Sequence, residues 1–416
     1  MKVAIDVADL KLGMQVVDLD CPWRDTPFLF QGFEIRSEEE IRALRQYCKR
    51  VFVLVNDASP AGAVREWQPL ENRQQIVEGE ILKLNNHPSA QSVREDVTSF
   101  EEEAGRVRDA FIDTRLLIQE VLHDAKLGRS LNIPGVKRSI RTLAESVVRN
   151  PDALMCYAQL KRKDDYTAMH SLRVCVLALT FGRHLGLAQD QMEALGLGAL
   201  LHDVGMVRVP DEILKKPDAL TPEEQQIMRR HVEWGVEILL GTQQMPALAI
   251  DAVRKHHERY DGSGYMAGLR GDEIGQVGMI AAIVDHYDAI TSDRSYNNAV
   301  TPYHALTRLY EWRDTLFEGA LVEKFIQCLG IYPIGTVVRL NSGEIGVVAA
   351  INRKHRLKPY VVLAQRADRT PYVETPIVNL ATWRTAGKGV CEIDSVLESS
   401  SVGVDPGRYL RAAVAL

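Results

Sequence analysis

The segment Leu195-Gly-Leu-Gly-Ala-Leu-Leu-His-Asp-Val-Gly205 is apolar up to a histidine and aspartate pair. Gly198 and Leu195 precede His202 by four and seven residues, the spacing that places side chains on one face of an α-helix. The segment therefore predicts a buried helix that presents His202, with Asp203 next to it, to the protein core.

Other polar residues lie on the apolar faces of predicted helices in the same way. His170 is followed by Val174 and Leu177 at i+4 and i+7, and His231 lies one turn from an isoleucine and a glycine. Asp285 has alanines four residues before and after it. A buried carboxylate at Asp285 requires a partner, because an unpaired charge there would be neutralised.

Seven such residues follow one another along the helical part of the chain. Steps of 32, 29, 25 and 28 residues separate successive members or pairs, each close to one helix plus a turn, so successive helices can deliver ligands to one bundle interior. Imidazoles and carboxylates without thiolates suit iron, manganese, nickel or zinc better than calcium or magnesium, and a carboxylate can bridge two ions. The candidate ligands are His170, His202, Asp203, His231, His256, His257 and Asp285.

A simpler interpretation applies to each of these residues taken alone, since a core-facing histidine is more often hydrogen-bonded than metal-bound. The ordered series of seven favours a shared metal site over that alternative. The remaining histidines of this region and beyond have no companions in such a series, and we interpret them as surface or structural residues: His184, His286, His304 and His355.

The periodicity predicts a multidomain protein with three parts. Residues 1–135 are expected to form a small N-terminal regulatory α/β module followed by a linker and a helix. Residues 136–331 are expected to form an all-α catalytic bundle, within a helical pattern that runs from about Val107 to Gly330. Residues 332–416 are expected to form a small β-rich appendage with a mobile tail.

Local signals add detail to this division. Strands are expected at 14–20, 51–55, 336–340, 346–350 and 360–363, a helix at 38–47 and a linker at 59–99. Thr221-Pro-Glu-Glu224 predicts a capping box that begins a helix carrying His231. The basic turn Arg353-Lys-His-Arg356 is interpreted as a solvated face.

Composition excludes several classes of protein. The net charge of −6 gives no general attraction for nucleic acid, so DNA binding is not expected. Six scattered cysteines without a CxxC pair indicate neither a disulfide framework nor a zinc ribbon. The sequence contains no apolar run of roughly 18 residues and no signal-peptide pattern, so we expect a cytoplasmic protein without a membrane span.

Several motifs, in order, resemble a known family. Leu200-Leu-His-Asp-Val-Gly205 is similar to the pair that names the HD superfamily of metal-dependent phosphohydrolases. His256-His-Glu-Arg-Tyr-Asp-Gly-Ser-Gly-Tyr265 resembles the extended signature of its HD-GYP branch, and the resemblance covers about Tyr166 to Tyr310. The N-terminal module, with Thr26-Pro-Phe-Leu-Phe-Gln-Gly-Phe33, also resembles a domain that often precedes such catalytic domains in bacteria.

The resemblance implies a phosphodiesterase that hydrolyses cyclic di-GMP to pGpG or GMP through a metal-bridging hydroxide. It implies that the seven candidates hold the metals, iron or manganese first and nickel, cobalt or zinc as alternatives, with Asp203 as the bridge. His202, Asp203 and Arg294 would act in catalysis. Contacts to substrate are expected from Tyr265, Asp288, Met206 and Arg294, and diguanylate cyclase (GGDEF) proteins are a further candidate partner.

Three departures from the family pattern bear on this expectation. Met206 replaces the usual lysine after the His-Asp pair, and Met266 replaces the usual proline after Gly-Tyr. Met206 follows His202 by four residues, so it is expected on the same helix face if the helix continues that far. Tyr166 stands where members with three metals have a glutamate, so we expect two ions. The methionines leave open a receptor that binds cyclic di-GMP or a protein partner without turnover. A phosphohydrolase acting on other nucleotides is a second alternative, which the segment from His256 to Tyr265 disfavours.

Overall fold

The chain divides into two compact units. The first unit consists of Met1–Ile76 and Val209–His231, and the second consists of Val77–Arg208 and Val232–Leu416. The computed structural model describes residues 2–20, 33–35, 38–54, 79–82, 84, 96–160, 166–216, 218, 220–292, 300–385 and 389–414. Most of the predicted linker at 59–99, and Arg294, lie outside these residues. In the described part of the chain, no helix is both long enough and apolar enough to cross a membrane.

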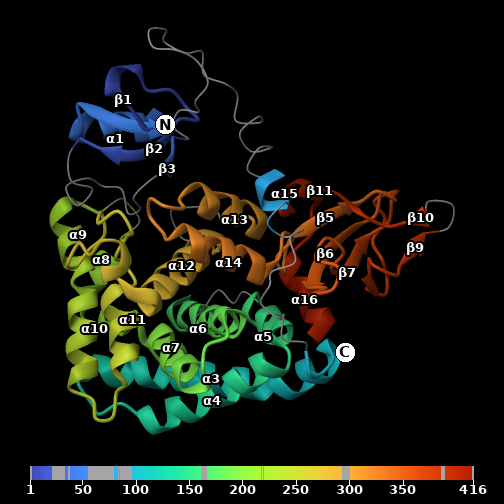
Figure 1. Cartoon of the computed structure of the whole chain (residues 1–416), viewed down its shortest axis with the longest axis horizontal. Helices are drawn as coiled ribbons and strands as arrows, with labels where there is room; N and C mark the ends of the chain where they lie inside the picture. Colours follow the sequence, from blue (N-terminus) through green and yellow to red (C-terminus); the bar gives the residue numbers. More distant parts are fainter. Residues whose placement is uncertain are drawn as a thin grey trace. The chain divides into compact units, whose positions relative to one another are not determined.

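The first unit contains a small antiparallel sheet in the order β1-β4-β2-β3 (Figure 1). Its apolar residues alternate along the strands, and Val16, Val51 and Val53 form a core with Ile41 and Leu44 of the neighbouring helix. The predicted strands and helix of this module are confirmed. Its elements are β1 (Lys2–Asp6), η1 (Val7–Asp9), β2 (Gln15–Leu19), β3 (Phe33–Glu34), α1 (Glu38–Tyr47) and β4 (Arg50–Leu54).

The same unit contains α8 (Asp211–Leu214) and α9 (Pro222–Arg229). The predicted capping box is present, since Thr221 Oγ1 accepts from the Glu224 N–H and the Glu224 carboxylate accepts from the Thr221 N–H. The expectation that this helix carries His231 is wrong. The Arg230 N–H bonds to the Ile227 carbonyl at 3.2 Å, a tightened turn that ends α9, and His231 begins α10.

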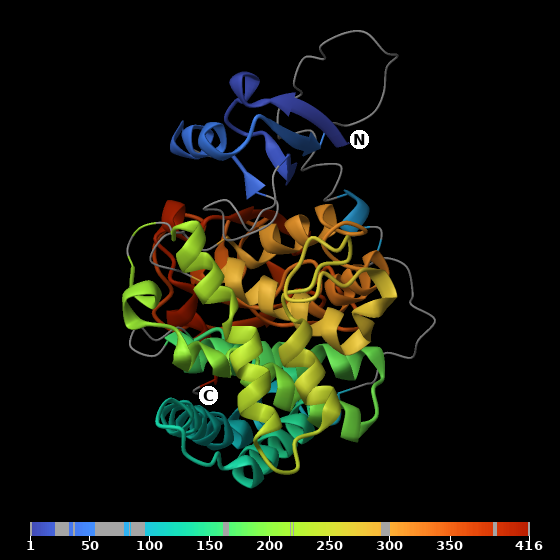
Figure 2. The same cartoon turned by 90° about the vertical axis from the view of Figure 1, so that its left-hand side faces the viewer.

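Helices dominate the second unit, as the periodicity predicts. In Figures 1 and 2, α3 and α4 lie along one side of the bundle. The helices are α3 (Phe100–Lys126), α4 (Ile133–Arg149), α5 (Pro151–Ala158), α6 (Tyr166–Leu185), α7 (Gln189–Leu201), η3 (Val204–Arg208), α10 (His231–Leu240), α11 (Ala247–Lys255), η4 (Gly271–Glu273), α12 (Gly275–Thr291), α13 (Pro302–Glu311) and α14 (Gly319–Leu329). Because α3 packs on α4, α5 and α6, the predicted boundary at residue 135 separates a helix from its packing partners.

Two of these helices approach unusually closely. A Cβ atom added to Gly198 of α7 would lie 2.7 Å from the Ala249 carbonyl oxygen and 2.6 Å from the Ala252 Cβ, both in α11. Only glycine fits at this contact, because backbone lies directly opposite. The carboxyl ends of α7 and α11, where His202 and His256 lie, are thereby held in register.

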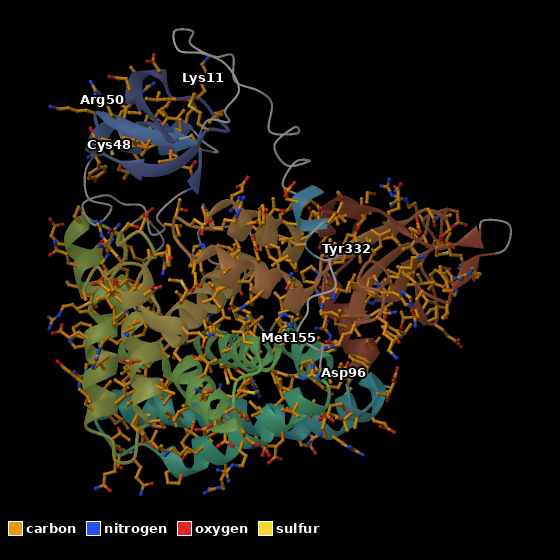
Figure 3. All side chains as sticks on the ribbon, viewed as in Figure 1. Lys11, Cys48, Arg50, Asp96, Met155 and Tyr332 are labelled. Atoms are coloured by element: carbon orange, nitrogen blue, oxygen red, sulfur yellow. The ribbon has the colours of Figure 1, made fainter. Side chains whose placement is uncertain are left out.

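The C-terminal part is a five-stranded antiparallel sheet in the order β11-β5-β6-β7-β8. Its residues alternate between two cores, so that Val347 joins the core of the helical bundle and Val348 joins a smaller core on the other face. Tyr332 packs against both cores, at the junction of bundle and sheet (Figure 3). The strands are β5 (Val337–Leu340), β6 (Ile345–Ala350), β7 (Tyr360–Gln365), β8 (Ile377–Asn379), β9 (Arg384–Thr385), β10 (Gly389–Val390) and β11 (Ile393–Leu397).

Two expectations about this part are corrected. The basic turn is solvated only in part. Lys354 and His355 are exposed, but Arg353 donates from Nη1 and Nη2 to Asp152 of α5, at 3.1 and 2.8 Å, and Nη1 also lies 2.7 Å from Asp96. The tail contains α15 (Ser399–Val402) and α16 (Pro406–Val414) rather than mobile chain. Tyr409 and Leu410 of α16 are buried in the bundle core, so the end of the chain packs on the helices.

Gly198→Ala should destabilise the bundle by about 1–3 kcal/mol, because the added methyl overpacks a contact with backbone. This loss should exceed the roughly 0.5–1 kcal/mol that alanine gains over glycine inside a helix. Gly105→Ala in α3 is the matched control, since no atom lies within 4 Å of its added Cβ, and it should be neutral or stabilising. Urea unfolding of both variants measures the difference, and equal stabilities would contradict the close approach.

Candidate metal centre

His202 and His256 end the two helices that meet at Gly198. Each is the C-cap residue of its helix, α7 and α11. His202 Nδ1 lies 2.9 Å from the Ala199 carbonyl oxygen, and His256 Nδ1 lies 2.7 Å from the Val253 carbonyl oxygen. A carbonyl only accepts, so each Nδ1 carries the proton and each Nε2 of the neutral ring keeps its lone pair for the bundle interior.

His231 shows the same arrangement with its own neighbours. Its Nδ1 lies 2.7 Å from the Met228 carbonyl oxygen, and the residue is 1% exposed. His231 thus has the tautomer and burial of the other two histidines. It belongs to the first unit, and its role as a ligand stays a prediction.

α6 and α12 bring His170 and Asp285 to the Nε2 atom of His202. His170 Nε2 lies 3.2 Å from His202 Nε2 and 3.3 Å from Asp285 Oδ1. One ligand atom from each of these three residues lies within 4.8 Å of the others, in an arrangement that could hold a metal ion. The rings of His170 and His202 meet edge to face, with centroids 5.0 Å apart.

Asp203 presents its two carboxylate oxygens to different histidines. Oδ2 lies 3.3 Å from His202 Nε2 and 3.7 Å from His170 Nε2. Oδ1 lies 3.8 Å from His256 Nε2. Asp203, His256 and His257 belong to a second group whose ligand atoms lie within 4.8 Å of one another. The carboxylate therefore lies between two groups of candidate ligands.

The carboxylates give this interior a negative field. Burial lowers the pKa of His202, but Asp203 and Asp285 outweigh burial and hold that pKa well above its usual value. Burial raises the pKa of Asp285, and His170 and His202 together hold it well below its usual value. The same field that favours protons on the imidazoles favours a metal cation among them.

The donor set fits a transition metal. Two imidazole nitrogens converge at 3.2 Å beside two carboxylates, an arrangement whose lone pairs repel one another unless a proton or a metal cation lies among them. Nitrogen and oxygen donors of this kind suit iron, manganese, nickel, cobalt or zinc. Of the sequence candidates, the structure brings together His170, His202, Asp203, His256, His257 and Asp285.

The loop that follows His257 is fixed by ring stacking and by hydrogen bonds to a buried carboxylate. The Tyr265 ring stacks on the His257 ring, with centroids 4.6 Å apart and an interplanar angle of 24°. Gly264 is required beside it, because a Cβ there would lie 2.5 Å from the Arg259 backbone nitrogen. Glu258 is 1% exposed, and its carboxylate oxygens accept from the Ala267 and Leu269 N–H groups at 2.8 and 3.0 Å.

The remaining sequence candidates have different outcomes. Met206 was expected to follow His202 on a continuing α-helix, but α7 ends at Leu201 and Met206 is half-buried in the 3₁₀ segment η3. The turn tightens because the Met206 N–H bonds to the Asp203 carbonyl at 2.9 Å. Asp288 lies behind His170, with a side chain that is 4% exposed, and not on an open surface as a substrate contact requires. Arg294 lies outside the described residues.

Sequence reasoning missed Arg173 and Glu258. Arg173 bonds to Asp288 through Nε at 2.6 Å, and its signal is the spacing of three residues from His170 on one helix. Glu258 follows the two histidines directly, so its signal is only proximity along the chain.

Family models and curated relatives are similar to most of the chain. Residues 153–321 match a model described as HD domain, and residues 2–135 match a domain of unknown function, DUF3391. A cyclic di-GMP phosphodiesterase of Pseudomonas aeruginosa is 34% identical over 378 residues, which cover 90% of this chain and 88% of that protein. A 3'3'-cGAMP-specific phosphodiesterase of Vibrio cholerae is 38% identical over 162 residues, covering 39% of this chain and 31% of that protein.

Among solved structures, an HDGYP protein from Bdellovibrio bacteriovorus is similar to 78% of this chain and 98% of its own, at 16% identity and a TM-score of 0.45.

Glu258→Gln should loosen the loop over His257, because an amide can accept from only one of the two N–H groups and turns a donor towards the other. We expect a loss of about 1–3 kcal/mol and faster hydrogen exchange at Ala267 and Leu269. Glu273→Gln is the control, since Glu273 is exposed and accepts the Arg270 N–H at 2.9 Å at the end of the same loop. Unchanged exchange in the Glu258 variant would refute this role.

Proposed function

The chain belongs to the HD-GYP family, and on that premise we propose that it is a metal-dependent phosphodiesterase that hydrolyses cyclic di-GMP to pGpG or GMP. The relative that covers most of its length carries the name of that activity. The observation that supports the proposal best is the position of Asp203, with one carboxylate oxygen towards His170 and His202 and the other towards His256.

We propose two transition-metal ions, iron or manganese. His170, His202 and Asp285 would hold one ion, and His256 and His257 the other, with Asp203 shared between them. His231 completes the second set in this proposal, because it shares with His202 and His256 the Nδ1 bond to a carbonyl three residues earlier. Tyr166 supplies no carboxylate for a third ion.

The ions, when bound, would activate a water molecule as the nucleophile and stabilise charge on the phosphate. The chain itself supplies the framework for that reaction. The Nδ1 bonds of His202 and His256 fix the ring orientations, so the donors are arranged before substrate arrives. Tyr265, stacked on His257, is proposed to contact the bound nucleotide, and Arg294 to contact a phosphate.

The substrate is proposed from the relatives that share the HD domain. Some of these enzymes are named for cyclic di-GMP and others for 3'3'-cGAMP, and the two cyclic dinucleotides differ in one purine base. The relative named for cyclic di-GMP shares both the N-terminal and the HD regions with this chain, whereas the one named for 3'3'-cGAMP matches 39% of the chain. This difference in coverage favours cyclic di-GMP.

The protein loaded with manganese or iron should bind about two ions per chain and hydrolyse cyclic di-GMP faster than 3'3'-cGAMP and faster than nucleoside monophosphate esters. Asp203→Asn should lower both the metal content and the rate, the rate by more than about 100-fold, since the shared carboxylate is lost. Asp251→Asn is the control, because this α11 carboxylate is about one-third exposed and pairs only weakly with Arg254 and Lys255. Full activity of the Asp203 variant, or of metal-free protein, would refute the proposal.

Met206→Lys should raise kcat/KM for cyclic di-GMP by about 10-fold or more, because a cation one short turn from Asp203 would offset charge that develops on the phosphate. Met206→Leu is the control, with similar size and no charge, and should leave kcat/KM unchanged. Steady-state kinetics at equal metal content make the comparison. Two inert variants that still bind cyclic di-GMP and metal would favour the receptor alternative instead.

A further inference from the structure

His170 is oriented differently from His202 and His256. Nδ1 of His202 and of His256 bonds to a backbone carbonyl of its own helix. His170 Nδ1 instead lies 2.7 Å from Asp288 Oδ2, on the neighbouring helix α12. A carboxylate that accepts a hydrogen bond from Nδ1 makes the Nε2 lone pair a stronger metal ligand than a neutral carbonyl in the same position does.

Asp288 is itself fixed by Arg173. The guanidinium donates from Nε to Oδ1 at 2.6 Å and from Nη2 to Oδ2 at 3.0 Å, the paired geometry that suits arginine and carboxylate. Nη2 also donates to Ser292 Oγ at 3.0 Å. Arg173 follows His170 by three residues on α6, and Asp288 follows Asp285 by three residues on α12. Each helix therefore carries one candidate ligand and, three residues later, one supporting residue: His170 and Arg173 on α6, and Asp285 and Asp288 on α12. Asp288 of α12 bonds to His170 of α6.

Asp288 has little capacity left for a substrate. Its oxygens accept from His170, from two nitrogens of Arg173, and from Ser292 Oγ at 3.4 Å, which accounts for the roughly four lone-pair sites of a carboxylate. Its side chain is 4% exposed. A phosphate ligand would also be repelled by a carboxylate that faces it directly.

We propose that Asp288 and Arg173 form a positioning pair that holds His170 with Nε2 towards Asp285 and strengthens it as a metal donor. This role replaces the contact between Asp288 and substrate that the sequence suggested, and it rests on the proposed metal site. The pair supports only the ligand group of His170, His202 and Asp285. The ion bound by that group should therefore depend on Asp288 more than the ion near His256 and His257 does.

Asp288→Asn tests the pair, because asparagine keeps the size of the side chain but loses its charge. The variant should release one of its two ions at a chelator concentration about 10- to 100-fold lower than the parent needs, while the second ion stays bound. Metal content after dialysis against graded chelator measures this. The visible spectrum of cobalt-loaded protein should change at one of two sites. In a His170→Ala background, Asp288→Asn should have no further effect on metal affinity.

Asp152→Asn is the matched control. Asp152 is also buried and also holds an arginine through two bonds, to Arg353, but it lies on α5 outside both ligand groups. Its loss should lower the unfolding midpoint and leave both metal affinities unchanged. If Asp288→Asn does not fold, Arg173→Lys keeps the charge and removes the paired donors, and it should weaken the same ion by a smaller factor.

The outcomes separate this inference from the proposed function. A parent protein that binds no transition metal would overturn both. A parent that binds two ions and hydrolyses cyclic di-GMP, together with an Asp288 or Arg173 variant of unchanged metal affinity and cobalt spectrum, would overturn the positioning role alone. A raised KM for cyclic di-GMP with unchanged metal affinity would restore Asp288 as a contact to substrate.

Discussion

The approach of α7 and α11 at Gly198 is the constraint on which the metal centre depends. Helix axes can come this close only where a side chain is missing, and at Gly198 the opposing atoms belong to backbone as well as to Ala252. Both helices then end at a histidine, so two imidazoles arrive together without any long loop to place them. α6 and α12 add His170 and Asp285 from within helices, where both residues are buried and packing leaves each side chain little freedom.

Helical periodicity predicted the bundle, and it placed His170, His202 and Asp285 on apolar helix faces, where the structure has them buried. It failed where the helical hydrogen-bond pattern changes over one turn. One α-helix ends just before Arg230, and the α-helix that ends at Leu201 is followed by a 3₁₀ segment. Neither change alters the spacing of apolar residues. His231 and Met206 were therefore placed on helices that end before them.

Partners that are distant in sequence were beyond prediction from one chain. Asp288 looked available for substrate because nothing near it in the sequence shows that Arg173 occupies its oxygens. Arg353 looked solvated because basic residues surround it, although its partner Asp152 lies 201 residues earlier. In both cases a buried carboxylate and an arginine pair across two elements, and only the folded chain shows which carboxylate belongs to which arginine.

The link between Asp152 and Arg353 bears on how such proteins are assembled from modules. Asp152 is 3% exposed within the helical region, and its counter-ion comes from the turn after β6 in the C-terminal sheet. Breaking a buried pair by removing one partner typically costs about 3–5 kcal/mol, a large fraction of the stability of a domain. The helical region therefore depends for its stability on the C-terminal sheet, which follows the last candidate metal ligand in the sequence. In gene fusion or domain exchange, the helices and the sheet would be inherited together, as one unit of recombination.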